Sequence, residues 1–248
     1  MQYKGQILLI TVMLLATVMT IVLSVSFKSV TDTQVTKLEE ESQKALAAAE
    51  SAIEVALKNN STATLGSGGS SELNSVTGFS GSATIESLAE TTFTTSIIPK
   101  DGSYTFYLGN YNLATKTIDT PYFNRNILLC FKLGSAVEAT LVKSNGVAKY
   151  LGDSTGTIIG APTGTCNGNV TYTKSIDIPA DPNGQFLLVR VLYASTKLFF
   201  SSNGINLPIQ GRTVSSQATS STSTGVSKKI VLFQSYPQIP AEFFSTSF

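Results

Sequence analysis

The stretch that decides the fold is Ile7–Phe27, ILLITVMLLATVMTIVLSVSF, which contains no charged residue. At about 1.5 Å of rise per residue, a helix of this length is about 30 Å long and matches the hydrocarbon core of a bilayer. Its threonines and serines can donate hydrogen bonds to the preceding helical turn, so an apolar environment tolerates them. The stretch therefore predicts a transmembrane helix.

A cleaved secretory signal peptide is the competing interpretation of the same stretch. Such a peptide has a shorter apolar region that is followed by a cleavage site between small residues. Here the apolar region is longer, and residues 28–32, Lys-Ser-Val-Thr-Asp, contain no obvious turn or helix breaker. The pattern favours a helix that continues beyond the apolar stretch.

The residues after the span place apolar or small side chains at steps of three and four. This spacing forms one stripe along a helix, made of Val35, Leu38, Ser42, Ala45, Leu46, Ala49, Ile53, Ala56 and Leu57. Opposite charges four residues apart, such as Glu40 and Lys44, support the outer face. Because no Gly or Pro interrupts the chain from Gln6 to Lys58, we expect one helix of roughly 80 Å over residues 6–58. Its second half should pack on a sheet.

Two segments of this helix carry a resemblance to a known family. A short leader, residues 1–5 with a single Lys, leads into Gly5-Gln6-Ile7-Leu8-Leu9-Ile10-Thr11-Val12, and Ala47-Ala48-Ala49-Glu50-Ser51-Ala52-Ile53-Glu54 forms an alanine-rich end. Together they resemble type IV pilin-like proteins, in particular minor pilins of the PilX type and the K-type tip pseudopilin of type II secretion. The resemblance covers about the first quarter of the chain.

The resemblance implies how the protein would be processed and assembled. A prepilin peptidase would cut after Gly5, and Gln6 would become the new N-terminus and the site of methylation. Residues 6–58 would act as the polymerisation arm that packs against other pilin subunits. The chain would cross the cytoplasmic membrane once, with an extracytoplasmic domain, and its assembled form would lie at the cell surface.

Two positions depart from the family's pattern. The mature chain would start with Gln6, where Phe or Met is usual, and its fifth residue is Ile10, where most pilins carry Glu. A carboxylate buried in an apolar helix bundle needs a cationic partner, which in the family is the terminal amine of a neighbouring subunit. K-type pseudopilins also lack this Glu and occupy the tip. We therefore expect a tip or initiating subunit.

The rest of the chain predicts an α+β fold, with a long N-terminal helix packed on an antiparallel, β-rich C-terminal domain. Residues 59–82 are rich in Ser, Thr, Gly and Asn and predict a flexible linker. Residues 83–248 predict a β domain. Its expected strands are Thr92–Ile98, Tyr104–Leu108, Ile127–Leu133, Val137–Lys143, Thr157–Ile159, Val170–Ile178, Phe186–Tyr193, Lys197–Phe200, Arg212–Gln217 and Lys229–Gln234.

The composition argues against most catalytic and nucleic-acid-binding functions. The 248 residues contain no His, which removes the usual triads, dyads and His-based zinc sites. The 17 Lys and Arg residues nearly balance 16 Asp and Glu residues, so no global field attracts nucleic acid. No acidic pair, phosphate-binding loop or metal motif stands out. We expect no enzyme, no cofactor, no metal and no nucleic-acid partner.

Two further features have alternative interpretations. Cys130 and Cys166 form a disulfide if the domain is exported, and otherwise Cys130 is a buried thiol and Cys166 a free one. Asp181-Pro-Asn-Gly184 could offer oxygens to calcium, but it lacks the run of acidic ligands of a calcium loop. Turn chemistry explains this segment fully.

Two functions from different classes fit the sequence. In the first, the chain is a structural minor pilin or pseudopilin, inserted in the membrane, cleaved after Gly5 and assembled into a pilus-like or secretion filament. In the second, the uncleaved helix anchors a surface adhesin or binding module. Tyr104, Tyr107 and Tyr111 would then suit a sugar-binding surface, although tyrosines suit β-sheets equally well.

Overall fold

The computed structural model describes residues 4–161, 164–166, 171–222 and 225–240. One long helix, α1 (Lys4–Asn59), packs on antiparallel β-sheets, which confirms the predicted α+β class. The chain divides into two compact units. The first contains residues 1–85 and 214–232, and the second contains residues 86–213 and 233–248.

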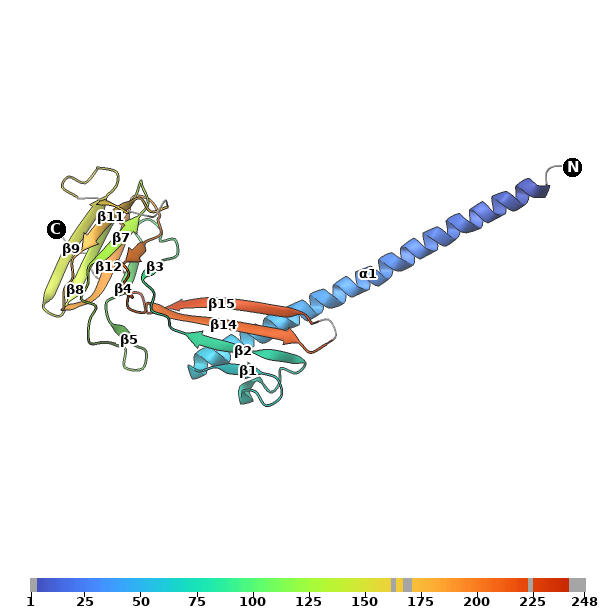
Figure 1. Cartoon of the computed structure of the whole chain (residues 1–248), viewed down its shortest axis with the longest axis horizontal. Coiled ribbons are helices and arrows are strands. Elements are labelled where there is room, and N and C mark those ends of the chain that lie inside the picture. Colours follow the sequence, from blue (N-terminus) through green and yellow to red (C-terminus); the bar gives the residue numbers. More distant parts are fainter. Residues whose placement is uncertain (1–3, 162–163, 167–170, 223–224, 241–248) are drawn as a thin grey trace. The chain divides into compact units, whose positions relative to one another are not determined.

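The first unit joins α1 to a four-stranded sheet (Figure 1). The strand order is β1 (Ala63–Leu65), β2 (Phe79–Glu86), β14 (Gly211–Ser220) and β15 (Ser227–Ser235). The shared core consists mostly of small side chains, among them Ala48, Ala49, Ala52 and Ala56 of the helix and Ala63, Ala83, Val214 and Ala218 of the strands. Small residues on both sides let the helix backbone lie close to the sheet.

The apolar stripe of the helix is buried only in its C-terminal part. Ala45, Ala49 and Ala56 are completely buried, whereas Val35 and Leu38 are 47% and 43% exposed. The prediction was right for the part of the stripe that faces the sheet. It was wrong for Val35 and Leu38, and for Leu46, which is 41% exposed.

The predicted flexible linker over residues 59–82 is wrong, because this segment belongs to the first unit. It contains β1, the 3₁₀ helix η1 (Ser71–Leu73) and the start of β2. The Ser70 backbone N–H donates to the Thr64 carbonyl at 2.9 Å, and the Thr64 N–H donates to Ser70 Oγ at 3.0 Å. The few apolar residues of this segment are sufficient because the alanine face of α1 completes their core.

The second unit contains two larger sheets around one core. One sheet has the order β10 (Gly164–Thr165), β11 (Lys174–Ile178), β7 (Ile127–Phe131), β13 (Phe199–Ser201) and β3 (Thr92–Thr94). The other has the order β4 (Ser103–Tyr107), β12 (Gly184–Leu192), β8 (Ala136–Lys143) and β9 (Gly146–Asp153). A separate hairpin pairs β5 (Asn110–Asn112) with β6 (Thr117–Asp119).

Side chains from both larger sheets form this core. Phe106 of β4 stacks on Phe200 of β13, with ring centroids 4.2 Å apart. The almost entirely apolar strand β12 is central, as predicted, because it pairs with both β4 and β8 and buries Leu187, Val189 and Val191.

Most of the strands expected in the second unit are present, with shifted ends. Thr157–Ile159 is not a strand, because Asp153 organises these residues as a loop. Its Oδ1 accepts hydrogen bonds from the N–H and hydroxyl of Thr155, and its Oδ2 accepts one from the N–H of Ile158. The sequence analysis missed β1, β2, β5, β6, β9 and β10, and the expected start of β11 at Val170 lies outside the described residues.

Candidate functional site: the exposed apolar half of the N-terminal helix

The apolar residues of the first half of α1 lie on its surface. From Leu8 to Phe27, the exposed fractions of the large apolar side chains range from 47% for Leu23 to 71% for Phe27. Within the described residues, the helix from Leu8 to Asn59 is long and apolar enough to cross a membrane. Figure 1 shows this half of the helix extending beyond the sheet of the first unit.

The threonine side chains within the span satisfy their hydrogen bonds inside the helix. The hydroxyl of Thr11 donates to the Leu8 carbonyl at 2.8 Å, and that of Thr17 donates to the Leu14 carbonyl at 2.8 Å. Thr20 donates to the Thr17 carbonyl at 2.8 Å. These hydroxyls therefore need no water, and the helix surface is compatible with lipid or with other apolar helices.

The residues predicted for processing lie at the start of this helix. The backbone of Gly5 and Gln6 is helical, while the side chain of Gln6 and residues 1–3 lie outside the described part of the chain. Ile10, which stands where the family usually has Glu, is 59% exposed. What this surface can do chemically is bury apolar area, since its described side chains offer no nucleophile or acid–base pair.

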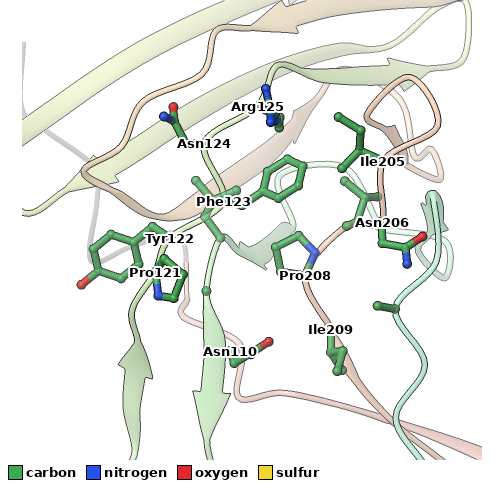
Figure 2. A pocket seen from close by; sticks show the side chains of 14 residues that line it. Asn110, Pro121, Tyr122, Phe123, Asn124, Arg125, Ile205, Asn206, Pro208 and Ile209 are labelled. Carbon is green, nitrogen blue, oxygen red and sulfur yellow. The ribbon is translucent and has the colours of Figure 1, made fainter.

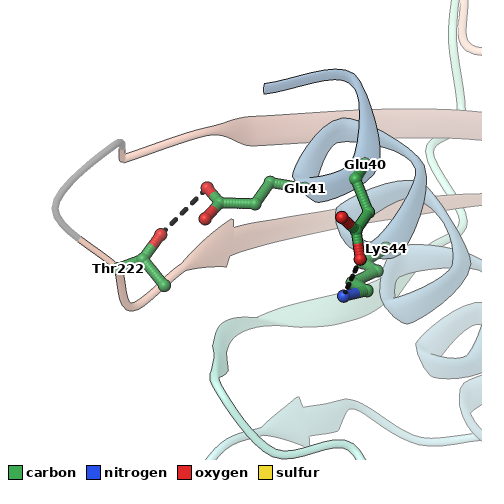
Figure 3. Close-up of polar contacts among 4 residues, drawn as sticks. All are labelled: Glu40, Glu41, Lys44 and Thr222. Carbon is green, nitrogen blue, oxygen red and sulfur yellow. Dashed lines mark hydrogen bonds and ion pairs between the residues drawn. The ribbon is translucent and has the colours of Figure 1, made fainter. Parts of the chain in front are cut away.

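A hairpin tip marks where the sheet begins to cover the helix. The hydroxyl of Thr222, in the turn between β14 and β15, donates to Oε2 of Glu41 at 2.9 Å (Figure 3). One residue earlier on the helix, Glu40 pairs with Lys44 at 2.6 Å on the exposed face. Burial of the helix against the sheet starts within the next turn, at Ala45.

The two cysteines are joined in the second unit. Cys130 of β7 forms a disulfide with Cys166, which follows β10. The pair is buried and packs beside Tyr172, whose ring stacks on Phe199 with centroids 5.7 Å apart. Disulfides persist mainly in oxidising compartments. The apolar N-terminal helix and this disulfide together are consistent with a membrane-anchored extracytoplasmic domain.

The tyrosines suggested for a sugar-binding surface are mostly buried. Tyr104 and Tyr107 are 8% and 4% exposed. The Tyr107 hydroxyl donates to the Pro237 carbonyl at 2.5 Å, and burial raises the pKa of Tyr107 to about 12. Half-buried Tyr111 packs on Tyr107, with ring centroids 5.1 Å apart. The expectation that Tyr104 and Tyr107 are exposed was wrong, because both side chains are buried.

The Asp181–Gly184 segment is a turn. Asp181 Oδ1 accepts a hydrogen bond from the Asn183 N–H at 2.9 Å, and Oδ2 pairs with the Lys143 ammonium at 3.2 Å. The Asn183 N–H and the Lys143 charge hold the pKa of Asp181 below its usual value. Among the described residues, no group of three or more His, Cys, Asp or Glu side chains could hold a metal ion.

An open cleft in the second unit was not predicted from the sequence. It has a volume of about 670 Å³, and its polar lining includes Asn110, Asn124, Arg125 and Asn206. Figure 2 shows these side chains together with Phe123, which also lines the cleft. The lining comes from residues 108–110, 121–125 and 205–209 together with Ala89, which are far apart in the sequence, so local patterns gave no signal for it.

Comparisons with protein-family models, with curated proteins and with solved structures found no match for this chain. The architecture, a long apolar N-terminal helix packed on antiparallel sheets, is consistent with a pilin-like fold.

Proposed function

We propose that this protein is a structural minor pilin or pseudopilin, which is inserted in the cytoplasmic membrane and then assembled into a pilus-like or secretion filament. One observation carries the proposal. A single helix is apolar and exposed in its first half, and its second half packs on the sheet of the first unit. The exposed first half needs an apolar environment, and the packed second half connects this first half to the folded domain.

Assembly would transfer the helix from one apolar environment to another. When the helix leaves the lipid, its apolar surface stays shielded from water if the helices of other pilin subunits cover that surface. The span contains small and hydroxyl-bearing residues, among them Ala16, Thr17 and Thr20, which allow close helix packing. The hydroxyls of Thr17 and Thr20 are already hydrogen-bonded within the helix. In this proposal, Gly5 and Gln6 define the point at which a prepilin peptidase releases the helix.

The proposed place in the filament is the tip. A subunit with Ile10 cannot offer a carboxylate to the terminal amine of a neighbouring subunit. Replacing Ile10 with Glu should therefore let the protein enter the shaft, whereas Ile10→Leu should not. Immunogold labelling of filaments would show the difference. Even labelling along filaments of the unsubstituted protein would contradict a tip position.

The test of the main proposal is the N-terminal mass of the protein isolated from its own membranes or surface fraction. A chain that begins at Gln6, with or without a methyl group, is the expected result. A chain that begins at Met1 would remove the processing step and with it the filament proposal.

A second candidate is an uncleaved, membrane-anchored binding module. The observation that favours it is the 670 Å³ cleft in Figure 2, whose size lies in the range of small-ligand sites. Arg125 and three asparagines could hydrogen-bond a polar ligand there, and Tyr122 and Phe123 supply apolar surface. An N-terminus at Met1, together with binding that Arg125→Ala abolishes, would support this candidate.

A further inference from the structure

A second cleft in the second unit combines aromatic rings with carboxylates. Its volume is about 710 Å³, within the range of about 300–1,000 Å³ for small-molecule sites. Phe93 of β3, Tyr104 of β4 and Phe233 of β15 line it together with Glu86 and Glu90. Among the described residues that line the cleft, none is basic. The lining therefore combines two carboxylates with aromatic surface and contains no cationic side chain.

The three rings form a connected wall. The Phe93 ring centroid lies 5.8 Å from that of Tyr104 and 6.0 Å from that of Phe233. Phe233 is 48% exposed and Phe93 is half-buried, so part of the wall is open to a ligand. An aromatic face attracts a cation within about 6 Å of the ring centroid, most strongly when the site is shielded from water.

The carboxylates of Glu86 and Glu90 have no hydrogen-bond or ion-pair partner among the described residues. Both side chains are exposed. The backbone at Glu90 is held in place, because its carbonyl accepts a hydrogen bond from the Leu207 N–H at 2.7 Å. The carboxylates can therefore pair with a ligand without first leaving another partner.

The third observation is a polar atom that lacks a partner. Tyr104 is 8% exposed, and its hydroxyl is buried without a hydrogen bond to any described residue. A buried hydroxyl without a partner destabilises the fold, because it has lost its hydrogen bonds to water. A ligand that brings a hydrogen-bond acceptor to this hydroxyl would remove this destabilisation.

We propose that this cleft binds a small organic cation, an alkylated ammonium that carries a hydroxyl group, as choline does. The rings and the two carboxylates take the cationic head, and the ligand hydroxyl accepts from Tyr104. An anion is disfavoured by the carboxylates. A bare metal ion would find two carboxylates on an aromatic wall, which is too few ligands for calcium.

The experiment titrates the full chain, held in a non-ionic detergent, with choline chloride by calorimetry. The matched neutral probe is 3,3-dimethylbutan-1-ol, which has carbon in place of the charged nitrogen. Choline is expected to bind about ten-fold more tightly, because only choline gains the cation–π and carboxylate attraction. Equal affinity for the two probes, or no choline binding at millimolar concentration, would overturn the proposal.

Variants locate the site. Phe233→Leu and the double change Glu86→Gln with Glu90→Gln should each weaken choline binding several-fold. Leu232→Ala, on the same strand but outside the cleft lining, should leave the affinity unchanged. Tyr104→Phe should weaken choline but not tetramethylammonium, which has no hydroxyl. If the cleft variants bind choline as tightly as the unsubstituted protein does, the site is not this cleft.

A last probe separates a free cation from a lipid headgroup. Glycerophosphocholine carries the same ammonium head and adds a phosphate, which Glu86 and Glu90 should repel. Free choline is therefore expected to bind more tightly than glycerophosphocholine. The opposite order would assign the cleft to phosphocholine headgroups and would overturn the inference of a free cation.

Discussion

At the scale of single residues, buried polar side chains act as replacements for missing backbone partners. Gln210 is 3% exposed, and its amide bonds to both the N–H and the carbonyl of Tyr107 at 2.8 Å. Gln210 supplies the hydrogen-bond donor and acceptor that a neighbouring strand would otherwise supply, so the backbone N–H and carbonyl of Tyr107 at the outer edge of β4 both have partners. Gln238 does the same for the Thr105 N–H at 2.7 Å.

Gln210→Ala should therefore lower the free energy of unfolding of the second unit by about 2 kcal/mol, because it leaves two buried backbone groups without partners. Gln210→Glu should be destabilising at neutral pH and partly recover in acid, where a protonated carboxyl can again donate. Urea unfolding at two pH values measures both effects. Gln185→Ala, whose side chain is only half-buried, is the control and should cost less.

Asp153 gives a prediction of pH dependence. Burial by itself raises the pKa of Asp153, but hydrogen bonds from the Thr155 hydroxyl and from backbone N–H groups of the loop outweigh it and leave the pKa below its usual value. A lowered folded-state pKa means that the ionised group stabilises the fold above the unfolded-state pKa of about 3.9. This stabilisation is lost as the pH falls through the folded-state pKa.

Asp153→Asn should thus be destabilising at pH 7, by about 1–3 kcal/mol, since the amide cannot accept all the hydrogen bonds that the carboxylate accepts. The difference from the unsubstituted protein should shrink below about pH 4. Denaturant titrations at pH 7 and pH 3 would measure it. The control is Asp119→Asn, at an exposed carboxylate on β6, and an unchanged difference at both pH values would contradict the argument.

At the scale of elements, the packing of α1 depends on the small size of its buried residues. Ala49 is completely buried against the sheet, whereas Ala47, two residues earlier, is exposed. Ala49→Leu should destabilise the first unit by about 1–3 kcal/mol through overpacking. Ala47→Leu adds the same atoms on the open face and should change stability by less than about 0.5 kcal/mol. Hydrogen exchange in β2 would report the difference, and equal protection in the two variants would contradict close packing.

The elements also show which features could be predicted. The long helix, the central strand β12 and the turn at 181–184 follow from local patterns, because periodicity and turn chemistry act over a few residues. The order in residues 59–82 could not be predicted, since Leu65 and Leu73 are buried by a helix face and not by their neighbours in sequence. Strand β9 was missed because its eight residues alternate only weakly, and pairing with β8 along its whole length stabilises it.

The candidate functional surfaces also include one that could be predicted from the sequence and others that could not. The exposed apolar helix was evident from Ile7–Phe27 alone, because a membrane-spanning pattern is continuous in sequence. The two clefts were not, since the first brings together residues 121–125 and 205–209, and the second brings together parts of 86–96 and 233–235, which only the tertiary fold places side by side. Burial of Tyr104 and Tyr107 was equally hidden, because tyrosine suits both a surface and a core.

At the scale of the whole molecule, the disulfide and the division into units predict unequal responses to reduction. The bridge joins residues 36 apart, and a loop of this length contributes about 3–4 kcal/mol in the chain-entropy model. Reduction should lower the stability of the second unit and leave hydrogen-exchange protection of α1 and β1 unchanged. In a Cys130→Ala, Cys166→Ala variant, reductant should have no effect. Loss of protection in both units together would show that they unfold as one.

The order of the units along the chain has a consequence for biosynthesis. The second unit's segment 86–213 is inserted between the two halves of the first unit, residues 1–85 and 214–232. A polypeptide that emerges from its N-terminus presents the alanine face of α1 long before β14 and β15 exist to cover it. Domains tend to fold as units in the order of their synthesis, but here the unit that begins first is completed only after residues 86–213 of the second unit have been made. Between the synthesis of α1 and that of β14 and β15, the uncovered face of the helix would be open to contact with a membrane, a chaperone or another binding partner.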